Sequence, residues 1–185
     1  FMNLSETDKA AVIVTALIHG DFVLASGERA SVKLDFDRVE GELYELCVRA
    51  MAEILRTRYP HLKTLVSVAH GATRIAESLK EELDITHIAT DHDGEKPRVF
   101  RLLGGVCDKV VIVEDVFNKG TNTGKVAQLV TNEGGDVQGI VAAINRSANS
   151  KPFIQAGSGI LVPVAAAIHY DMESGESKIP ECDNL

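Results

Sequence analysis

Short apolar runs alternate with segments of helical periodicity along most of this chain. The run Val110 to Val113 has four β-branched residues without alternation, which is typical of a strand covered on both faces in a parallel sheet. Similar runs are found at Thr64 to Val68, Ile85 to Ala89, Val137 to Ile144 and Leu161 to Ala167. Apolar residues at helical spacing predict helices at Ala10 to Ile18, Val39 to Arg58, Ile75 to Leu83 and Lys125 to Glu133. This order predicts an α/β fold, a doubly wound and mostly parallel sheet in a single domain.

The two ends of the chain have different patterns. Ser5 and Asp8 form an N-capping pattern at the start of the first helix, and Gly20 is expected to end that helix. The runs Gly20 to Gly27 and Ser31 to Asp37 then predict a hairpin-like pair of short strands. The polar tail, residues 171–185, is expected to be loosely ordered.

The polar residues after Val110 to Val113 are the first candidates for chemistry. Glu114 and Asp115 are predicted to lie at the carboxyl end of this central strand, where ligands bind in open α/β sheets. Gly120 lets the following loop curl toward a helix N-terminus, whose N–H groups can bind a phosphate. Because carboxylates accept hydrogen bonds from neighbouring hydroxyls, an acidic pair beside a phosphate site suits a ribose 5-phosphate.

Two other interpretations of this segment stay open. Acids at strand ends are common in solvated turns, which need no ligand. The segment Gly120 to Lys125 also looks similar to a P-loop, but three residues separate its glycines instead of four. Val126 moreover stands where a P-loop has its Mg²⁺-binding Ser or Thr, so the spacing disfavours this alternative.

The segment Lys109 to Lys125 resembles the phosphoribosyl pyrophosphate motif of type I phosphoribosyltransferases, with orotate phosphoribosyltransferases as the nearest subfamily. Four apolar residues, two acids and two apolar residues precede a Thr/Gly-rich loop. In that loop Gly120 and Thr121 match the family, whereas Asn118 and Lys119 depart from it. The resemblance implies that the two acids hold the ribose hydroxyls. It also implies that a 5-phosphate is bound by Asn118, Lys119, Gly120, Thr121, Asn122 and Thr123.

A second motif near the N-terminus matches the same subfamily. Its Gly-x-Phe-x-Leu-x-Ser-Gly segment is matched at Gly20, Phe22, Leu24, Ser26 and Gly27. This resemblance implies a small hood formed by about residues 1–38, with Ser26 near the base. Ala25 stands where the family commonly has a Lys that approaches the substrates.

The loop after Thr64 to Val68 is a third match, because the family wraps this loop around the pyrophosphate. Gly71 and Ala72 supply the small residues, but the family often has a basic residue at Gly71. Arg74 is expected to compensate, and a solvated position in the first helical turn is the alternative. His70 could act as an acid or base, although a loop histidine is more often structural.

Residues 90–103 have little apolar periodicity in their first part and are predicted to be a mobile loop. In the resembled family such a loop closes over pyrophosphate and contributes basic residues to a neighbouring subunit, which implies a homodimer. The candidates in this chain are His92, Lys96, Arg98 and Arg101. A solvated connection without a function is the alternative.

Arg146 follows the predicted strand Val137 to Ile144 and matches an arginine that pairs with the orotate carboxylate in the resembled enzymes. Asn145 departs from the aspartate that usually precedes this arginine. Because Ala25 and Gly71 leave two cationic positions empty, orotate is expected to be a poor acceptor unless another cation lies nearby. A neutral base would reduce that requirement.

Composition limits the possible partners and compartments. The chain has 185 residues, of which 45% are hydrophobic and 25% charged, as expected for an ordinary globular domain. Its net charge of −8 argues against binding to nucleic acid or to an acidic membrane surface. No apolar run approaches the roughly 18 residues of a membrane span, so the cytoplasm is the expected location. The three cysteines form no Cys-x-x-Cys pair and indicate neither a disulfide framework nor a zinc site.

Together the three motifs predict transfer of a 5-phosphoribosyl group from phosphoribosyl pyrophosphate to a nitrogen heterocycle, with orotate as the first acceptor to test. Mg²⁺ is expected to bind mainly through the pyrophosphate of the donor, without a metal site made by the protein alone. A non-catalytic sensor of phosphoribosyl pyrophosphate or of a nucleotide, built on the same fold, is the main alternative. An unrelated α/β nucleotide-binding protein is less favoured, because no Gly-x-Gly-x-x-Gly follows a strand.

Overall fold

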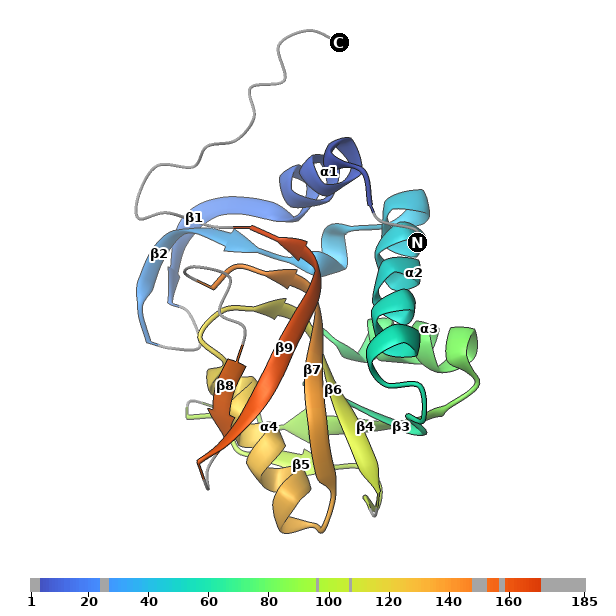
Figure 1. Cartoon of the computed structure of the whole chain (residues 1–185). Helices are drawn as coiled ribbons and strands as arrows, with labels where there is room; N and C mark the ends of the chain where they lie inside the picture. Colours follow the sequence, from blue (N-terminus) through green and yellow to red (C-terminus); the bar gives the residue numbers. More distant parts are fainter. Residues whose placement is uncertain are drawn as a thin grey trace, which may run out of the picture.

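A mixed sheet of seven strands forms the centre of the protein (Figure 1). The computed structural model describes residues 4–23, 27–95, 97–106, 108–147, 153–156 and 159–170. The strand order is β5-β4-β3-β6-β7-β9-β8, and β1 pairs with β2 in a separate two-stranded sheet. The five central strands run parallel, whereas the edge strands β5 and β8 are antiparallel to their neighbours. The predicted α/β class with a mostly parallel sheet is therefore confirmed.

The elements follow one another in the alternating order that the sequence predicts. In chain order they are α1 (Glu6–Ala16), β1 (Leu17–Val23), β2 (Arg29–Leu34), the short 3-10 helix η1 (Phe36–Arg38), α2 (Gly41–Arg58), β3 (Thr64–Ser67), α3 (Thr73–Leu83), β4 (Thr86–His92), β5 (Phe100–Leu102), β6 (Lys109–Phe117), α4 (Thr121–Asn132), β7 (Asp136–Asn145), β8 (Phe153–Ala156) and β9 (Ile160–His169).

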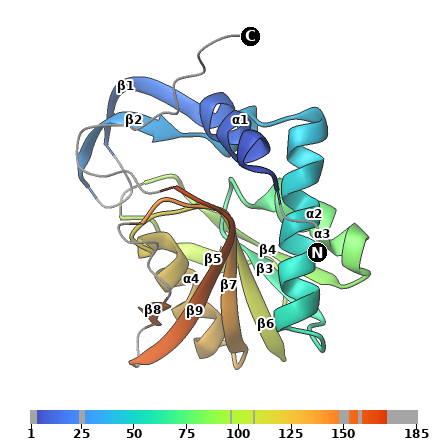
Figure 2. The same cartoon turned by 45° about the horizontal axis from the view of Figure 1, so that its top comes forward.

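Helices cover both faces of the large sheet (Figure 2). On one face α2 packs against β7 and β9, and α3 packs against β3 and β4, with Met51 and Leu55 of α2 fully buried. On the other face α4 buries Val126 and Val130 against β6, β7 and the two edge strands. The central strands are thus apolar on both sides, which explains their continuous β-branched runs.

The N-terminal elements form the small hood, which arches over the end of the sheet at which the parallel strands finish (Figures 1 and 2). Its first helix has the predicted capping box: the Ser5 hydroxyl accepts from Asp8 N at 3.1 Å, and the Asp8 carboxylate accepts from Ser5 N. The predicted continuation of this helix to Ile18 is wrong. Leu17 is extended and pairs with Leu34 across β1 and β2, so strand pairing ends the helix before Gly20.

The segment predicted as a loop at residues 90–103 is partly a β-hairpin. Strand β4 continues to His92 and pairs with β5, which places Asp91 opposite Arg101 and His92 opposite Phe100. The side chains of Asp91 and Arg101 form an ion pair across the strands, which stabilises the pairing. The connection between the two strands is therefore limited to residues 93–99. Lys96, in this connection, lies outside the described residues.

Candidate active site

Strand register brings the three sequence motifs to one edge of the sheet. Ser67 at the end of β3 lies beside Val113, and Val68 N donates to Val113 O at 3.0 Å. At the end of β7, Asn145 lies beside Phe117, and Arg146 N donates to Phe117 O at 2.8 Å. Residues that are far apart in sequence therefore surround the acidic pair of β6.

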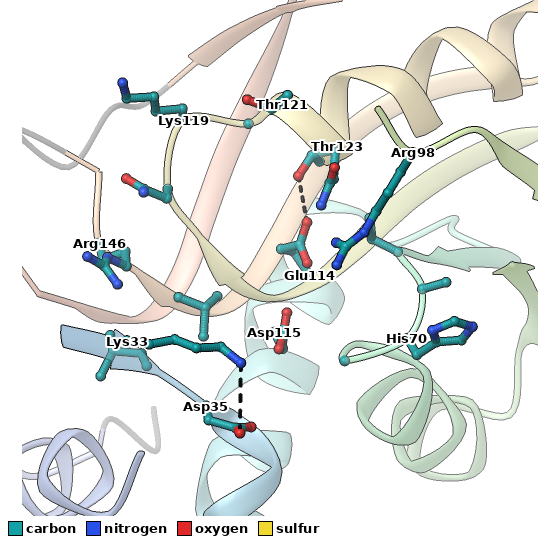
Figure 3. Close-up of a pocket in the computed structure, with 18 of the residues that line it drawn as sticks. Lys33, Asp35, His70, Arg98, Glu114, Asp115, Lys119, Thr121, Thr123 and Arg146 are labelled. Atoms are coloured by element: carbon teal, nitrogen blue, oxygen red, sulfur yellow. Dashed lines mark hydrogen bonds and ion pairs between the residues drawn. The ribbon is translucent and has the colours of Figure 1, made fainter. Parts of the chain in front are cut away.

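A cavity of about 510 Å³ opens at this edge, between the sheet, the start of α4 and the hood (Figure 3). Most of the predicted site residues line it. They are Gly71, His92, Arg98, Glu114, Asp115, Asn118, Lys119, Gly120, Thr121, Asn122, Thr123 and Arg146. The structure thus gathers side chains from four separate segments around one space.

Glu114 is buried at the inner wall of the cavity. It lies inside β6 rather than at the strand end, because β6 continues to Phe117. The Thr123 hydroxyl donates to Glu114 Oε2 at 2.7 Å (Figure 3). Burial, followed by the nearby charge and hydrogen bond of Asp115, raises the pKa of Glu114 well above its usual range. The buried position of Glu114 therefore favours its neutral form, which the sequence alone does not reveal.

Asp115 occupies space that only a glycine leaves open. A Cβ atom added at Gly71 would lie 2.2 Å from Asp115 Oδ2. Any side chain at position 71 would displace this carboxylate, because atoms cannot approach so closely. With Asp115 in this position, the loop after β3 has no room for the basic residue that the resembled family often has here.

The N-terminus of α4 faces the cavity beside the acids. The helix begins at Thr121, so the prediction of a helix start at Lys125 is wrong, and Thr121 to Thr123 form its first turn. Gly120 precedes the helix with φ of +80°, a conformation that favours glycine. The first N–H groups of a helix have no partner within it and bear partial positive charge, so this end can bind a phosphate. Lys119 Nζ, just before the helix, pairs with Glu28 Oε1 of the hood at 2.5 Å.

The hood contributes polar side chains that the sequence analysis did not select. Lys33 and Asp35 both line the cavity, with Lys33 Nζ 4.0 Å from Asp35 Oδ2 (Figure 3). Asp37 of η1 lines the cavity as well. The polar residues 33, 35 and 37 alternate with apolar ones in the sequence, which was the available signal, although only Lys33 belongs to the strand.

Arg146 reaches the cavity from the end of β7. Its guanidinium is half-buried, and burial lowers the pKa of Arg146 from its usual value. In the part of the chain that the structure describes, Arg146 Nε is buried without a hydrogen-bond partner. Since buried donors are normally paired, this guanidinium is well suited to bind an anion.

A second basic cluster lies on the opposite side of the acids, where Arg98 and His70 both line the cavity. Figure 3 shows the Arg98 side chain extending toward Glu114, whereas the His70 ring is turned away from the acids. Arg98 Nε is also buried without a hydrogen-bond partner within the described ranges. The rings of His70 and His92 are 4.5 Å apart between centroids. Arg101 does not line the cavity, because it pairs with Asp91 on the hairpin.

Two predicted pyrophosphate contacts lie elsewhere. Arg74 does not line the cavity: its guanidinium donates to Val39 O at 2.8 Å and lies 4.2 Å from the centre of the Tyr44 ring. It anchors the hood to α3 and does not replace a cation in the loop. Ala72 is fully buried and does not line the cavity either, while its N–H donates to Val68 O at 3.3 Å. Ser26, Lys96 and Ala25 lie outside the described residues.

Near the site, the described residues include no group of three or more His, Cys, Asp or Glu side chains placed to hold a metal ion. Burial raises the pKa of the free thiol of Cys47 to about 12, so this cysteine is not an effective nucleophile or ligand. Cys107 and Cys182 lie outside the described residues. No helix in the described ranges is long and apolar enough to cross a membrane.

Comparison with known proteins identifies relatives over most of the chain. The orotate phosphoribosyltransferase of Erythrobacter litoralis is 33% identical over 139 residues, which span 72% of this chain and 71% of that protein. The orotate phosphoribosyltransferase of Methanosarcina acetivorans is 25% identical over 174 residues, 89% of this chain and 92% of that protein. No protein-family model matches the chain.

Solved structures show the same fold. The orotate phosphoribosyltransferase from Aeropyrum pernix superposes with a TM-score of 0.67 at 22% identity, covering 86% of this chain and 92% of that one. The adenine phosphoribosyltransferase from Rhodothermus marinus gives a TM-score of 0.65 at 17% identity, covering 89% of this chain and all of that one.

Proposed function

The chain belongs to the orotate phosphoribosyltransferase family, and from this premise we propose that its cavity binds phosphoribosyl pyrophosphate and transfers the 5-phosphoribosyl group to orotate. It is a phosphoribosyltransferase, a member of the glycosyltransferase class. The observation that best supports the site is the position of the β6 acids beside the α4 N-terminus, in one cavity. A non-catalytic sensor on the same fold is not favoured by these relatives.

The donor can be placed from the chemistry of the cavity. Its 5-phosphate fits the N-terminus of α4, where free N–H groups and Lys119 attract an anion. Its ribose hydroxyls then lie at Asp115, whose carboxylate accepts hydrogen bonds. The buried Glu114 carboxyl, which accepts a hydrogen bond from Thr123, lies beside Asp115 in the same cavity.

The reaction breaks the bond from C1 of the ribose to pyrophosphate and forms a bond from C1 to the base nitrogen. Positive charge develops on the ribose as pyrophosphate leaves, and the carboxylate of Asp115 stabilises that charge electrostatically. The chain contributes mainly position and exclusion of water, because water would otherwise hydrolyse the donor. Closure of residues 93–99 over the cavity is the proposed source of that exclusion.

Two cations favour an acceptor with a carboxylate. Arg146 offers a half-buried guanidinium, and Lys33 is directed into the same cavity from β2 (Figure 3). Lys33 is the cation that we propose in place of the lysine absent at position 25. We therefore place the acceptor between the hood and the end of β7.

Magnesium fits this site as a partner of the donor. Mg²⁺ usually keeps several waters and binds one or two carboxylates together with substrate phosphates. Asp115 and Asp35 line the cavity and could supply such carboxylates, consistent with an ion that arrives with the donor. When bound, the ion would balance the charge of the leaving pyrophosphate.

We also propose a homodimer that acts in the cytoplasm. Val99 and Leu103 flank β5 and are strongly exposed, at 71% and 61%, which suits a contact between subunits. Analytical ultracentrifugation tests the oligomeric state, and a monomer at micromolar concentration would contradict the proposed dimer.

The function is tested by mixing the protein with phosphoribosyl pyrophosphate, Mg²⁺ and orotate, uracil, hypoxanthine or adenine, and measuring pyrophosphate release. Orotate should be the best acceptor. Arg146→Ala should lower kcat/KM for orotate by about tenfold to a hundredfold, the effect of one charged hydrogen bond, while Arg49→Ala on the exposed side of α2 serves as the control. Pyrophosphate release with a purine but not with orotate would contradict the proposed acceptor.

A further inference from the structure

Lys125 of α4 is a charged residue that the proposed reaction does not use. It is the last residue of the segment Gly120 to Lys125, which looks similar to a P-loop, but it does not line the cavity. Its Nζ instead donates to the backbone O of Arg98 at 2.9 Å. Because Arg98 lies in the connection between β4 and β5, this hydrogen bond joins that connection to the helix whose N-terminus faces the cavity.

Arg98 is turned inward relative to its neighbours. Pro97 and Val99 are exposed, whereas Arg98 is half-buried and lines the cavity. Its side chain extends toward Glu114 (Figure 3). Within the described ranges its Nε is buried without a hydrogen-bond partner. Such a guanidinium is suited to bind an anion, because a buried donor without a partner gains a hydrogen bond when an acceptor arrives.

Two contacts with α4 fix the backbone at this point. Strand β5 packs against α4, and its Phe100 belongs to the same buried apolar cluster as Val126, the residue after Lys125. This packing anchors the chain two residues beyond Arg98 but does not set the direction of the arginine. The hydrogen bond from Lys125 does so, because the peptide unit is planar and a bond to Arg98 O orients the whole unit that joins it to Val99.

The position of Lys125 on the helix gives no other reason for a lysine. The N-terminal end of a helix bears partial positive charge, which favours acids there and cations at the opposite end. Lys125 lies near the N-terminal end of α4, which begins at Thr121. Its charge therefore does not stabilise the helix, and an unbranched apolar residue in its place should leave α4 intact.

We propose that Lys125 is a positioning residue for Arg98: it holds the end of the β4–β5 connection on α4, so that the Arg98 guanidinium stays directed into the cavity and binds an anionic group of the donor. This inference rests on the proposed function for the identity of that ligand. Lys125 acts without touching the substrate, and its effect passes through Arg98. The arginine and the acids of β6 then belong to one chain.

The first test is a double-mutant cycle on the affinity for phosphoribosyl pyrophosphate with Mg²⁺, measured by calorimetry. Arg98→Ala should weaken binding by about tenfold to a hundredfold, the effect of one charged hydrogen bond. Lys125→Met should weaken it by about threefold to tenfold in the wild type, because the arginine is no longer held in place. In the Arg98→Ala background the same change should cost less than about twofold.

Two further variants separate positioning from charge. Lys125→Arg keeps a charged donor and should restore most of the affinity, whereas Lys80→Met removes the same charge from α3 and should match the wild type. A lysine that attracted the donor directly would cost the same with and without Arg98. Equal costs of Lys125→Met in the two backgrounds, or full affinity of Lys125→Met in the wild type, would overturn the proposal.

The second test needs no ligand. Trypsin should cut the free protein after Arg98 several times faster in Lys125→Met than in Lys125→Arg or Lys80→Met, with the fragments identified by mass spectrometry. Equal rates of this cut in a protein that forms product from orotate would overturn the role of Lys125 and leave the proposed function standing. Faster cutting of Lys125→Met, in a protein whose wild type does not bind the donor, would instead refute the proposed function and support Lys125 as the residue that holds Arg98.

Discussion

The hydrogen bond between Thr123 and Glu114 allows a quantitative test of the inner wall of the cavity. Thr123→Val keeps the shape of the side chain but removes the hydroxyl that donates to Glu114 Oε2 at 2.7 Å. Both side chains are almost completely buried, at 1% and 8% exposure, so water cannot easily replace the lost donor. Leaving a buried acceptor unpaired costs on the order of 1 to 3 kcal/mol.

Urea unfolding should therefore show a loss of about 2 kcal/mol in the free energy of unfolding of Thr123→Val. For a chain of this size the melting temperature should fall by roughly 4 to 8 °C. Thr131→Val is the matched control in the same helix, because the Thr131 hydroxyl donates only to Ala127 O, one turn earlier, at 2.9 Å. That change should cost less than about 0.5 kcal/mol.

A double-mutant cycle tests whether the loss comes from this contact. In a Glu114→Met background no carboxyl oxygen needs a donor, so Thr123→Val should then cost roughly 1 kcal/mol less than in the wild type. Equal costs for Thr123→Val in both backgrounds, or equal costs for the two threonine variants, would refute the reasoning.

Three further predictions follow from the same region. Glu114→Gln should make the protein less sensitive to rising pH. Because the pKa of Glu114 is raised on folding, the folded state binds more protons than the unfolded state. Wild-type stability therefore falls as pH rises from about 4.5 toward the folded pKa. Melting temperatures that change with pH in the same way for both proteins, between pH 4 and 9, would contradict this. Gly71→Ala should displace the Asp115 carboxylate and lower kcat/KM at least tenfold. Gly105→Ala is the control, because a Cβ there meets no atom within 4 Å. Equal activities of the two variants would show that the contact between Gly71 and Asp115 does not matter for the reaction. Trypsin should cut the free protein within residues 93–99, at Arg98, and donor with Mg²⁺ should suppress that cut; the same rate in both states would indicate a segment that does not respond to ligand.

Most of the large sheet could be predicted because its strands follow a simple rule. Strands covered by helices on both faces need continuous apolar runs, and the runs that become β3, β6 and β7 are of this kind. The edge strands β5 and β8 could not be found in this way. Each has only three or four residues and is stabilised by pairing with a longer neighbour, which is a long-range effect.

The site was predictable where its residues follow a strand directly. The acids of β6 and Arg146 after β7 could be placed because parallel strands end at the same edge of the sheet. The contribution of Lys33 depends on how the β1–β2 hairpin arches over the cavity, which no local pattern specifies. Arg74 was misplaced for a similar reason, since the first turn of α3 faces η1 and Tyr44 instead of the cavity.

The central claim is that Asp115 lies in the site where the 5-phosphoribosyl group is transferred. The most direct test is the rate at which orotate is converted to its ribonucleotide 5′-monophosphate, with phosphoribosyl pyrophosphate and Mg²⁺, for the wild type and Asp115→Asn. The account predicts activity in the wild type and a loss of at least about tenfold in kcat/KM for a folded Asp115→Asn, since one charged hydrogen bond to the ribose is worth on the order of 1.5 to 3 kcal/mol. Unchanged kinetics in a folded Asp115→Asn protein would contradict the account and move the reaction away from this cavity.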